Sequence, residues 1–300
     1  MFNTTAYSSN ITIYTHGKGF ENGMSKVIVL LDVDGVLVHA RAYRAAAKAS
    51  VEHVARRMGQ HHISGPDDTH MLAFEARSII SEWDSIALCA AELLNQASDL
   101  WGDSLDASLQ NIAESGRHLK QPDFAALARR CSPPSDEIQP GPAALGTIFP
   151  NEAPFIQLLA STHSIDGPMT QIFQHFTLGH TRYQQAYGLP VQFESDSLLE
   201  TLDKPMLSEQ SRDMLLNRAD VFPTLYTARP GLPPDFVTDH AGYSPEAEMA
   251  RQQVGLETVP AVGYGKMRWL ALQDQRHDSD YLQPSPVHAT VAVFNALLHG

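Results

Sequence analysis

The chain has 300 residues, of which 43% are hydrophobic, and its 34 acidic and 21 basic side chains give a formal net charge of −13. This length and apolar content allow one large core or two smaller ones, and the acidic balance argues against general affinity for nucleic acid or an anionic membrane. No apolar run reaches the roughly 18 residues that span a bilayer. The two cysteines, Cys89 and Cys131, are too few for a disulfide framework and indicate a reducing, cytoplasmic location.

The N-terminal residues 1–23 are polar and lack the basic start and apolar core of a signal peptide. We therefore expect a disordered extension there, with the folded domain beginning at Met24. The run from Val27 to Leu31 is continuous, apolar and rich in β-branched residues. Such a run predicts a strand buried on both faces, as in a parallel sheet.

Residues 41–202 are rich in Ala, Leu, Gln and Glu at helical spacing, which predicts a helical block. Strand signals return at 221–227 and 259–263, and helices are expected at 244–253, with Ser244 as N-cap, at 266–275 and at 284–298. Strand–helix alternation at both ends predicts an α/β fold with a Rossmann-like parallel sheet. Its core would comprise residues 24–40 and 203–300, with the helical domain 41–202 inserted after the first strand.

Two acids, Asp32 and Asp34, follow the first predicted strand, one residue apart. Two carboxylates at the carboxyl end of a buried strand are costly for a purely structural role, and open α/β sheets bind ligands at those ends. Gly35 supplies the backbone freedom that would let both acids face one ligand. The alternative is a capping or turn pair of acids after a strand.

The segment from Leu30 to Leu37, an apolar strand followed by Asp-x-Asp-Gly-x-Leu, resembles the first motif of the haloacid dehalogenase (HAD) superfamily. The resemblance implies that Asp32 is a nucleophile that forms an aspartyl-phosphate. It implies that Asp34 is the general acid and base. It also implies Mg²⁺, bound by the Asp32 carboxylate and the Asp34 backbone carbonyl, which offsets repulsion between the nucleophile and a phosphate. The helical block then resembles the cap domain of the phosphoglycolate-phosphatase-like subgroup.

The later HAD motifs are matched in part. The second motif, a strand that ends in Thr or Ser, fits Thr227, which is followed by Ala228 and Arg229. The Thr227 hydroxyl would donate to a phosphate oxygen, or it would only cap a turn. Arg229 would add a phosphate contact or be a solvated loop arginine. The lysine of the third motif is replaced by Gln283, which can donate a hydrogen bond but brings no charge. Lys266 is the candidate substitute, or else an exposed lysine in the first turn of a helix.

The acidic pair of the fourth motif is expected shortly after Leu298 and does not occur before Gly300. We therefore expect either a fragment or an incomplete metal site. The favoured function is a Mg²⁺-dependent phosphatase of a phosphorylated small metabolite. Cleavage of a carbon–halogen bond is disfavoured by Asp34, because that reaction has no leaving oxygen to protonate. A catalytically impaired or truncated HAD-like binding protein is the other alternative, and Gln283 favours it.

Overall fold

The structure is a computed structural model that describes residues 3–7, 11–15, 26–131, 148–159, 161–240 and 242–299. The chain divides into two compact units. The first unit comprises residues 1–40, 185–189 and 199–300, and the second comprises residues 41–184 and 190–198. The sequence predicts boundaries at 41 and 203, so the two divisions share the first boundary and differ by four residues at the second. That the second unit acts as a cap stays a prediction.

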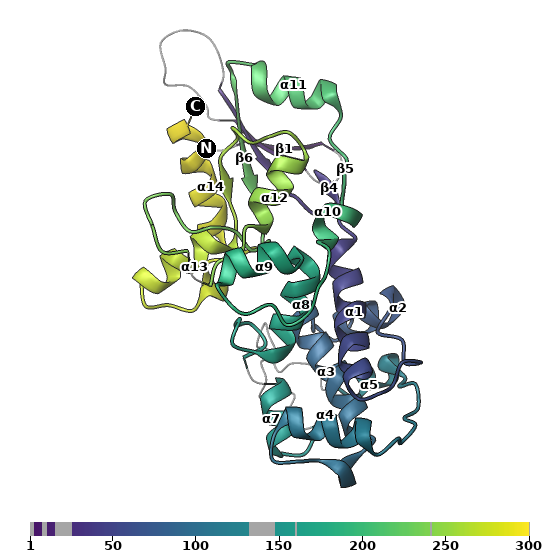
Figure 1. Ribbon diagram of the computed structural model, residues 1–300. Helices are drawn as coiled ribbons and strands as arrows, with labels where there is room; N and C mark the ends of the chain where they lie inside the picture. The colour runs from purple at the N-terminus through teal and green to yellow at the C-terminus, as the bar shows by residue number, and fades with distance from the viewer. Residues whose placement is uncertain are drawn as a thin grey trace. The chain divides into compact units, whose positions relative to one another are not determined.

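The first unit contains a five-stranded sheet with the order β1-β2-β3-β6-β7 (Figure 1). The strands are β1 (Asn3–Tyr7), β2 (Ile11–Thr15), β3 (Val27–Leu31), β6 (Val221–Tyr226) and β7 (Ala261–Val262). β3, β6 and β7 are parallel, whereas β1 and β2 are antiparallel to their neighbours. The sheet is therefore mixed, and its three parallel strands agree with the α/β core that the sequence predicts.

Strands β1 and β2 lie in the segment that the sequence predicts to be disordered, so the prediction differs from the structure there. β2 pairs with the edge of β3 that β6 leaves open. An open strand edge presents unpaired backbone N–H and C=O groups, and an added strand satisfies them. Residues 1–2, 8–10 and 16–23 of the predicted extension lie outside the described part of the chain.

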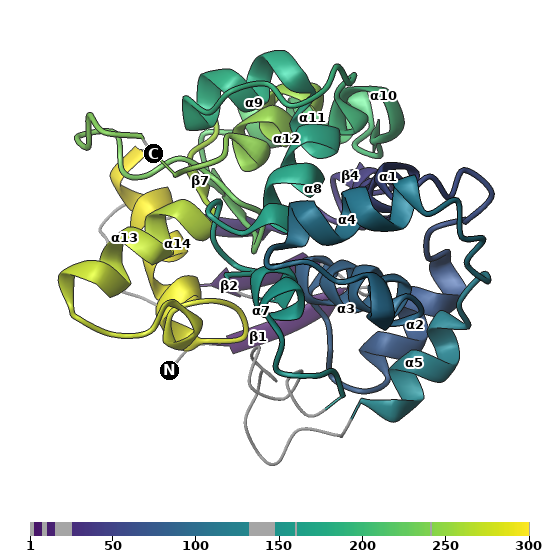
Figure 2. The ribbon, with the colours of Figure 1, turned by 60° about the horizontal axis from the view of Figure 1, so that its bottom comes forward.

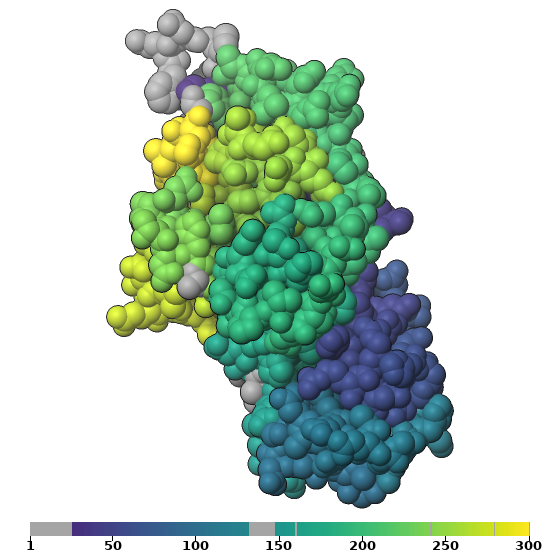
Figure 3. Space-filling model, viewed as in Figure 1, coloured from purple at the N-terminus to yellow at the C-terminus, as the bar shows by residue number. Residues whose placement is uncertain are grey.

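Helices cover both faces of this sheet. Val29 and Leu31 of β3 pack with residues of α12 (Glu246–Gln253) and α11 (Glu209–Asn217). Ile28 and Leu30 pack with residues of α13 (Tyr264–Gln273) and α14 (Pro286–His299). Figure 1 and Figure 2 show α12 and α14 on opposite sides of the strands, and α11, which has no buried residue, lies at the surface in Figure 3. Burial on both faces is the reason that β3 is apolar throughout.

A short two-stranded sheet marks the points where the chain leaves and re-enters the first unit. β4 (Val38–His39) pairs antiparallel with β5 (Lys204–Pro205), and the Met206 N–H donates to the Leu37 carbonyl at 2.8 Å. The two ends of the intervening segment are therefore held side by side. Such an arrangement accommodates a long insertion without disturbing the sheet.

The second unit is helical. Its helices are α1 (Ala42–Arg57), α2 (Asp68–Glu75), α3 (Glu82–Asn95), α4 (Leu105–Glu114), α5 (Phe124–Arg130), α7 (Ala153–Leu159) and α8 (Pro168–Leu178), with a 3₁₀ turn at Ser98–Leu100. α9 (His180–Tyr187) and α10 (Leu198–Leu202) lie where the two units alternate along the chain, and a second 3₁₀ turn in the first unit spans Asp278–Asp280. None of the helices in the described ranges is long and apolar enough to cross a membrane.

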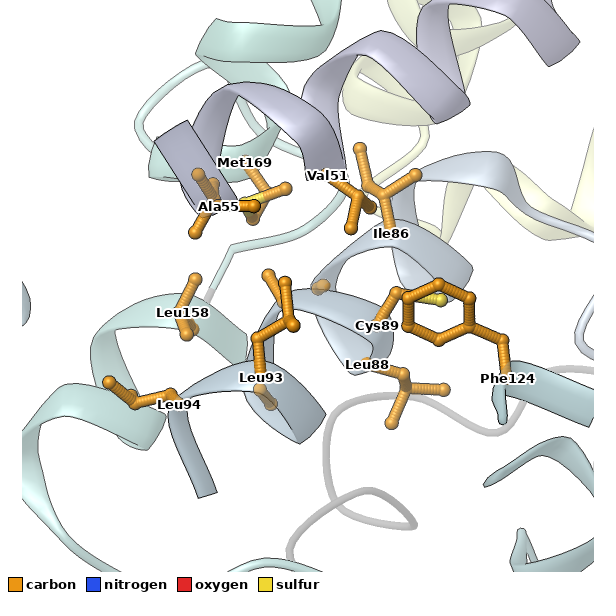
Figure 4. Packing of buried hydrophobic residues seen from close by; sticks show 14 of the residues in the cluster. Val51, Ala55, Ile86, Leu88, Cys89, Leu93, Leu94, Phe124, Leu158 and Met169 are labelled. Carbon is orange, nitrogen blue, oxygen red and sulfur yellow. The ribbon is translucent and has the colours of Figure 1, made fainter. Parts of the chain in front are cut away.

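The core of the second unit is built around α3 (Figure 4). Leu88, Leu93 and Leu94 of this helix are buried with Val51 of α1, Phe124 of α5, Leu158 of α7 and Met169 of α8. Both cysteines are buried free thiols. Burial raises the pKa of the Cys89 thiol well above its usual value and that of Cys131 to about 11, so neither is an activated thiolate.

The predicted N-cap of α12 is wrong. Pro245 occupies the cap position, and the Ser244 hydroxyl donates to the Glu246 carboxylate at 2.9 Å instead of accepting from the helix. The buried Glu246 carboxylate needs hydrogen-bond donors, because an unsatisfied buried charge is costly. The Ser244 hydroxyl therefore donates to Glu246 and does not cap the helix. Helices α1 and α4 lie in the helical block predicted at 41–202, whereas α11 lies in a part of the chain for which the sequence predicts no helix.

His175, on α8, is fully buried in the second unit. Its ring stacks on Tyr183 and Phe193, with centroid distances of 4.0 and 4.4 Å. Its Nε2 accepts a hydrogen bond from the Gln192 N–H at 3.2 Å, which requires an unprotonated nitrogen. Burial lowers the pKa of His175 to about 4, and burial likewise lowers that of His53 to about 4.

We expect acid to destabilise the second unit in the pH range from about 6.5 down to about 4. In this range the unfolded imidazoles bind protons and the folded ones do not, so the free energy of unfolding falls as the pH falls. Between these pH values, the free energy of unfolding of His175→Gln should fall by on the order of 3 kcal/mol less than that of the wild-type chain. Urea unfolding at a series of pH values measures the effect, with the exposed His61→Gln as the matched control. An unchanged pH dependence in His175→Gln would contradict the assignment.

Candidate active site

The two predicted catalytic acids follow β3, the middle strand of the five-stranded sheet. β3 and β6 are paired in parallel, with Leu31 opposite Leu225. Asp32 is the first residue after β3, and Thr227 is the first residue after β6. Because neighbouring parallel strands bring their carboxyl ends to the same edge of a sheet, Asp32 and Thr227 lie on one edge of the first unit.

The turn after β3 carries Asp34. The Val33 carbonyl accepts from the N–H groups of Leu37 and Val38 at 3.0 and 2.9 Å, and the Gly35 N–H donates to the Val38 carbonyl at 2.9 Å. Gly35 has φ +74°, and a Cβ added there would meet no atom within 4 Å. The left-handed backbone conformation, rather than lack of space, therefore requires glycine, in agreement with the freedom predicted for this position.

Asp32 is half-buried, and the Val33 N–H donates to its Oδ1 at 2.7 Å. Burial raises the pKa of Asp32, and the negative charge of Asp34 acts in the same direction. The Val33 N–H and the positive charge of Arg229 oppose this shift. A cation close to Asp32 would therefore favour the ionised carboxylate that a nucleophile needs.

Arg229 is buried and binds two carboxylates of the first unit. Its Nε donates to the two oxygens of Asp34 at 2.9 and 3.1 Å, and its Nη2 donates to Asp34 Oδ1 as well. The same Nη2 donates to Asp203 Oδ2 at 2.8 Å. The alternative of a solvated loop arginine is thus wrong, because the residue is only 3% exposed. The structure places the guanidinium on the acidic turn, and a contact with phosphate stays a prediction.

The backbone around Arg229 is fixed by close packing. Its N–H donates to the Thr227 hydroxyl at 3.2 Å, and its carbonyl accepts from the Tyr264 N–H at 2.9 Å. Gly265 lies so close to the next part of this loop that an added Cβ would be 1.9 Å from the Gly231 carbonyl oxygen. The glycines around Tyr264 therefore allow α13 to approach the loop that carries the guanidinium.

Three more predicted residues lie at the end of β6. Thr227 is buried, and its hydroxyl accepts from the backbone as described above, whereas Ala228 is exposed. The Gln283 side chain donates from Nε2 to the Tyr226 carbonyl at 3.2 Å. The structure thus brings the Gln283 amide to the carboxyl end of β6, one residue before Thr227.

Lys266 interacts with other charged groups than Asp32 does. It is half-buried in the first turn of α13, and burial lowers its pKa while the charges of Asp235 and Glu248 oppose that shift. The charged groups that shift the pKa of Asp32 are Asp34 and Arg229, and Lys266 is not among them. Arg229, rather than Lys266, is therefore the cation that the structure associates with Asp32.

Asp203 is a site residue that the sequence does not reveal. Its side chain is fully buried against Arg229, and its backbone carbonyl accepts from Gln253 Nε2 at 2.7 Å. It falls at the predicted boundary of the helical block, outside any motif. The sequence offers one signal for Asp203: it is an acid at the position where the predicted helical block ends and the chain returns to the predicted core.

Oxygen donors at this edge fit a hard divalent cation. Asp34 and Asp203 form ion pairs with Arg229, and Asp32 is close enough for the charge of Arg229 to shift its pKa. The three carboxylates and the guanidinium together have a formal charge of −2 when all four are ionised. Among the described residues, no three His, Cys, Asp or Glu side chains form a metal cage. Mg²⁺ does not require one, since it usually keeps several waters and binds through one or two carboxylates and a substrate phosphate.

No protein-family model matches this sequence, and no curated protein matches it. Among solved structures, the chain is similar to phosphatase Tt82 from Thermococcus thioreducens, with 18% identity and a TM-score of 0.51, over 89% of this chain and 78% of that one. It is also similar to the X-ray structure of Northeast Structural Genomics Consortium target ZR25, with 15% identity and a TM-score of 0.59, over 90% of this chain and 77% of that one. At these identities the likeness shows a shared fold, and each alignment covers more of the chain than either unit alone.

We expect Arg229→Ala to lower the free energy of unfolding by about 3–5 kcal/mol, because it leaves the buried Asp203 carboxylate without its guanidinium partner. Urea unfolding followed by circular dichroism measures this change. The matched control is Arg218→Ala, which removes an exposed ion pair with Asp220 and should change stability little. Equal effects of the two substitutions would show that the buried pair is no more stabilising than the exposed one.

Proposed function

We propose that the protein is a HAD-type phosphatase that hydrolyses a phosphorylated small molecule through an aspartyl-phosphate on Asp32. The observation that carries this proposal is the position of Asp32, half-buried at the carboxyl end of β3 and beside the end of β6, with which β3 pairs in parallel. Ligands of open α/β sheets bind at that edge. The shared fold with a protein named a phosphatase gives independent support.

In this reaction an Asp32 carboxylate oxygen attacks phosphorus, and the bond from phosphorus to the leaving oxygen breaks. Asp34 protonates the leaving oxygen, and its carboxylate then takes a proton from the water that hydrolyses the aspartyl-phosphate. The products are an alcohol and inorganic phosphate, with Asp32 regenerated. The Thr227 hydroxyl, Arg229 and the Gln283 amide are proposed to donate hydrogen bonds to phosphate oxygens.

Mg²⁺ is proposed as the cofactor, held by the Asp32 carboxylate and the Asp34 backbone carbonyl. When bound, it would supply positive charge that offsets repulsion between the nucleophile and the phosphate. The formal charge of −2 on the three carboxylates and Arg229 supports this requirement, because an anionic site repels a phosphate dianion. The buried free thiols are consistent with the cytoplasmic location that we propose.

A phosphate-binding protein without turnover is the second candidate. The main observation in its favour is that both carboxylate oxygens of Asp34 accept hydrogen bonds from Arg229, so they are engaged before any substrate arrives. Gln283 in place of lysine also reduces the positive charge available to the phosphate. Binding of inorganic phosphate and Mg²⁺ by calorimetry, without phosphate release from any substrate, would favour this candidate.

We expect the wild-type chain to release phosphate from members of a panel of sugar, nucleotide and short-chain phosphate monoesters, and EDTA to abolish the release. Asp32→Asn should lower the rate by roughly three orders of magnitude or more, because it removes the nucleophile. Malachite-green detection measures the rate, and mass spectrometry after acid quench should find phosphate on the peptide that contains Asp32.

The matched control is Asp213→Asn, an exposed position on α11 that should leave the rate unchanged. Phosphate release that persists in Asp32→Asn, or that is indifferent to EDTA, would contradict the proposed mechanism.

A further inference from the structure

The two carboxylates that bind Arg229 differ in their surroundings. The Asp34 side chain is 40% exposed, whereas the side chains of Asp203 and Arg229 are each 1% exposed. Asp34 therefore borders solvent, and Asp203 lies in the interior with the guanidinium. If the Asp34 carboxylate left Arg229, it could be hydrated by water. If Asp203 or Arg229 lost its partner, its charge would stay buried without hydration, which is strongly unfavourable.

This difference matters for the reaction proposed above. Asp34 must move protons to the leaving group and from water, yet both of its oxygens are held by Arg229. If Asp34 were the sole anion on this guanidinium, its release would leave a buried cation without a partner, which is strongly unfavourable. The 2.8 Å bond from Arg229 to Asp203 keeps the guanidinium paired when Asp34 departs.

The position of Asp203 does not depend on Asp34. Its backbone carbonyl is held by Gln253 of α12, and the next two residues form β5, which pairs with β4. The Arg229 backbone is held separately, through its hydrogen bonds to Thr227 and Tyr264. Both ends of the Asp203–Arg229 pair are thus anchored to the first unit by bonds that survive a movement of the Asp34 side chain.

We propose that Asp203 is a positioning residue: it retains Arg229 as a paired, buried cation and so allows Asp34 to exchange between the guanidinium and the reacting phosphate ester. The proposal rests on the phosphatase function proposed above. Asp203 touches neither phosphorus nor the leaving group and acts through Arg229. With Asp203 neutralised, Arg229 should retain Asp34, and the steps that need the free carboxylate should slow.

The first test is a kinetic comparison of the wild-type chain with Asp203→Asn, which keeps the shape and an acceptor oxygen but removes the charge. We expect kcat to fall about tenfold or more while KM changes less than about twofold, because Asp203 does not contact the substrate. A purely structural role would reduce the amount of active protein, so active-site titration by burst phosphorylation of Asp32 is used to normalise kcat. The control is again Asp213→Asn.

The second test needs no activity. Thermal unfolding should show a small change in Tm for Asp34→Asn and a decrease of roughly 5 °C or more for Asp203→Asn, because only the latter disrupts the interior pair. A larger decrease for Asp34→Asn would overturn the inference by making Asp34 the structural partner of Arg229.

The outcomes separate the two proposals. Turnover by the wild-type chain together with an undiminished kcat in Asp203→Asn overturns this inference and leaves the phosphatase function intact. Absence of turnover in the wild-type chain, with phosphate bound but not released, overturns the phosphatase function and with it the catalytic role of Asp203. A kcat effect with an unchanged KM and the expected order of Tm values supports both.

Discussion

One buried guanidinium links the three segments that form the candidate site. Arg229 follows β6, Asp34 lies in the turn after β3, and Asp203 precedes β5, so residues that are far apart in the chain meet at one charge. A buried arginine is tolerated only when carboxylates and hydrogen bonds satisfy it. The need to satisfy the buried guanidinium therefore constrains three segments: the end of β6, the turn after β3 and the residues before β5. Asp32 belongs to the second of these segments, so its surroundings depend on the same need.

This arrangement also determines the electrostatics of the site. The guanidinium is shared between two acids, so it compensates neither Asp32 nor an incoming phosphate in full. Burial raises the pKa of Asp32, and additional positive charge nearby would lower it. Among the described residues, the one cation that shifts the pKa of Asp32 is Arg229, and Arg229 is bound to carboxylates. The divalent cation proposed above would add the positive charge that this arrangement does not supply in full.

Much of the architecture could be predicted from local patterns. The apolar run of β3, the two acids that follow it and the helical spacing after residue 41 are properties of neighbouring residues, and sequence periodicity reports them. The partnership of Arg229 with Asp203 is not such a property. It is set by tertiary contacts between separate segments, and a lone acid or a lone arginine in a loop carries no spacing that reveals it. Ser244 was mispredicted for a related reason, because its partner, the carboxylate of Glu246, matters only once both are buried.

The second unit is inserted in the chain between Asp34 and Asp203, the two acids that bind Arg229. The chain leaves the first unit at residue 40, six residues after Asp34, and its last re-entry, at residue 199, comes four residues before Asp203. The pairing of β4 with β5 holds both connections together, so the two carboxylates on Arg229 flank the insertion at its two ends. Asp203 is buried and is held through both its backbone and its side chain, whereas the Asp34 side chain is 40% exposed. The exchange proposed for Asp34 is therefore compatible with an Asp203 that keeps its place on Arg229.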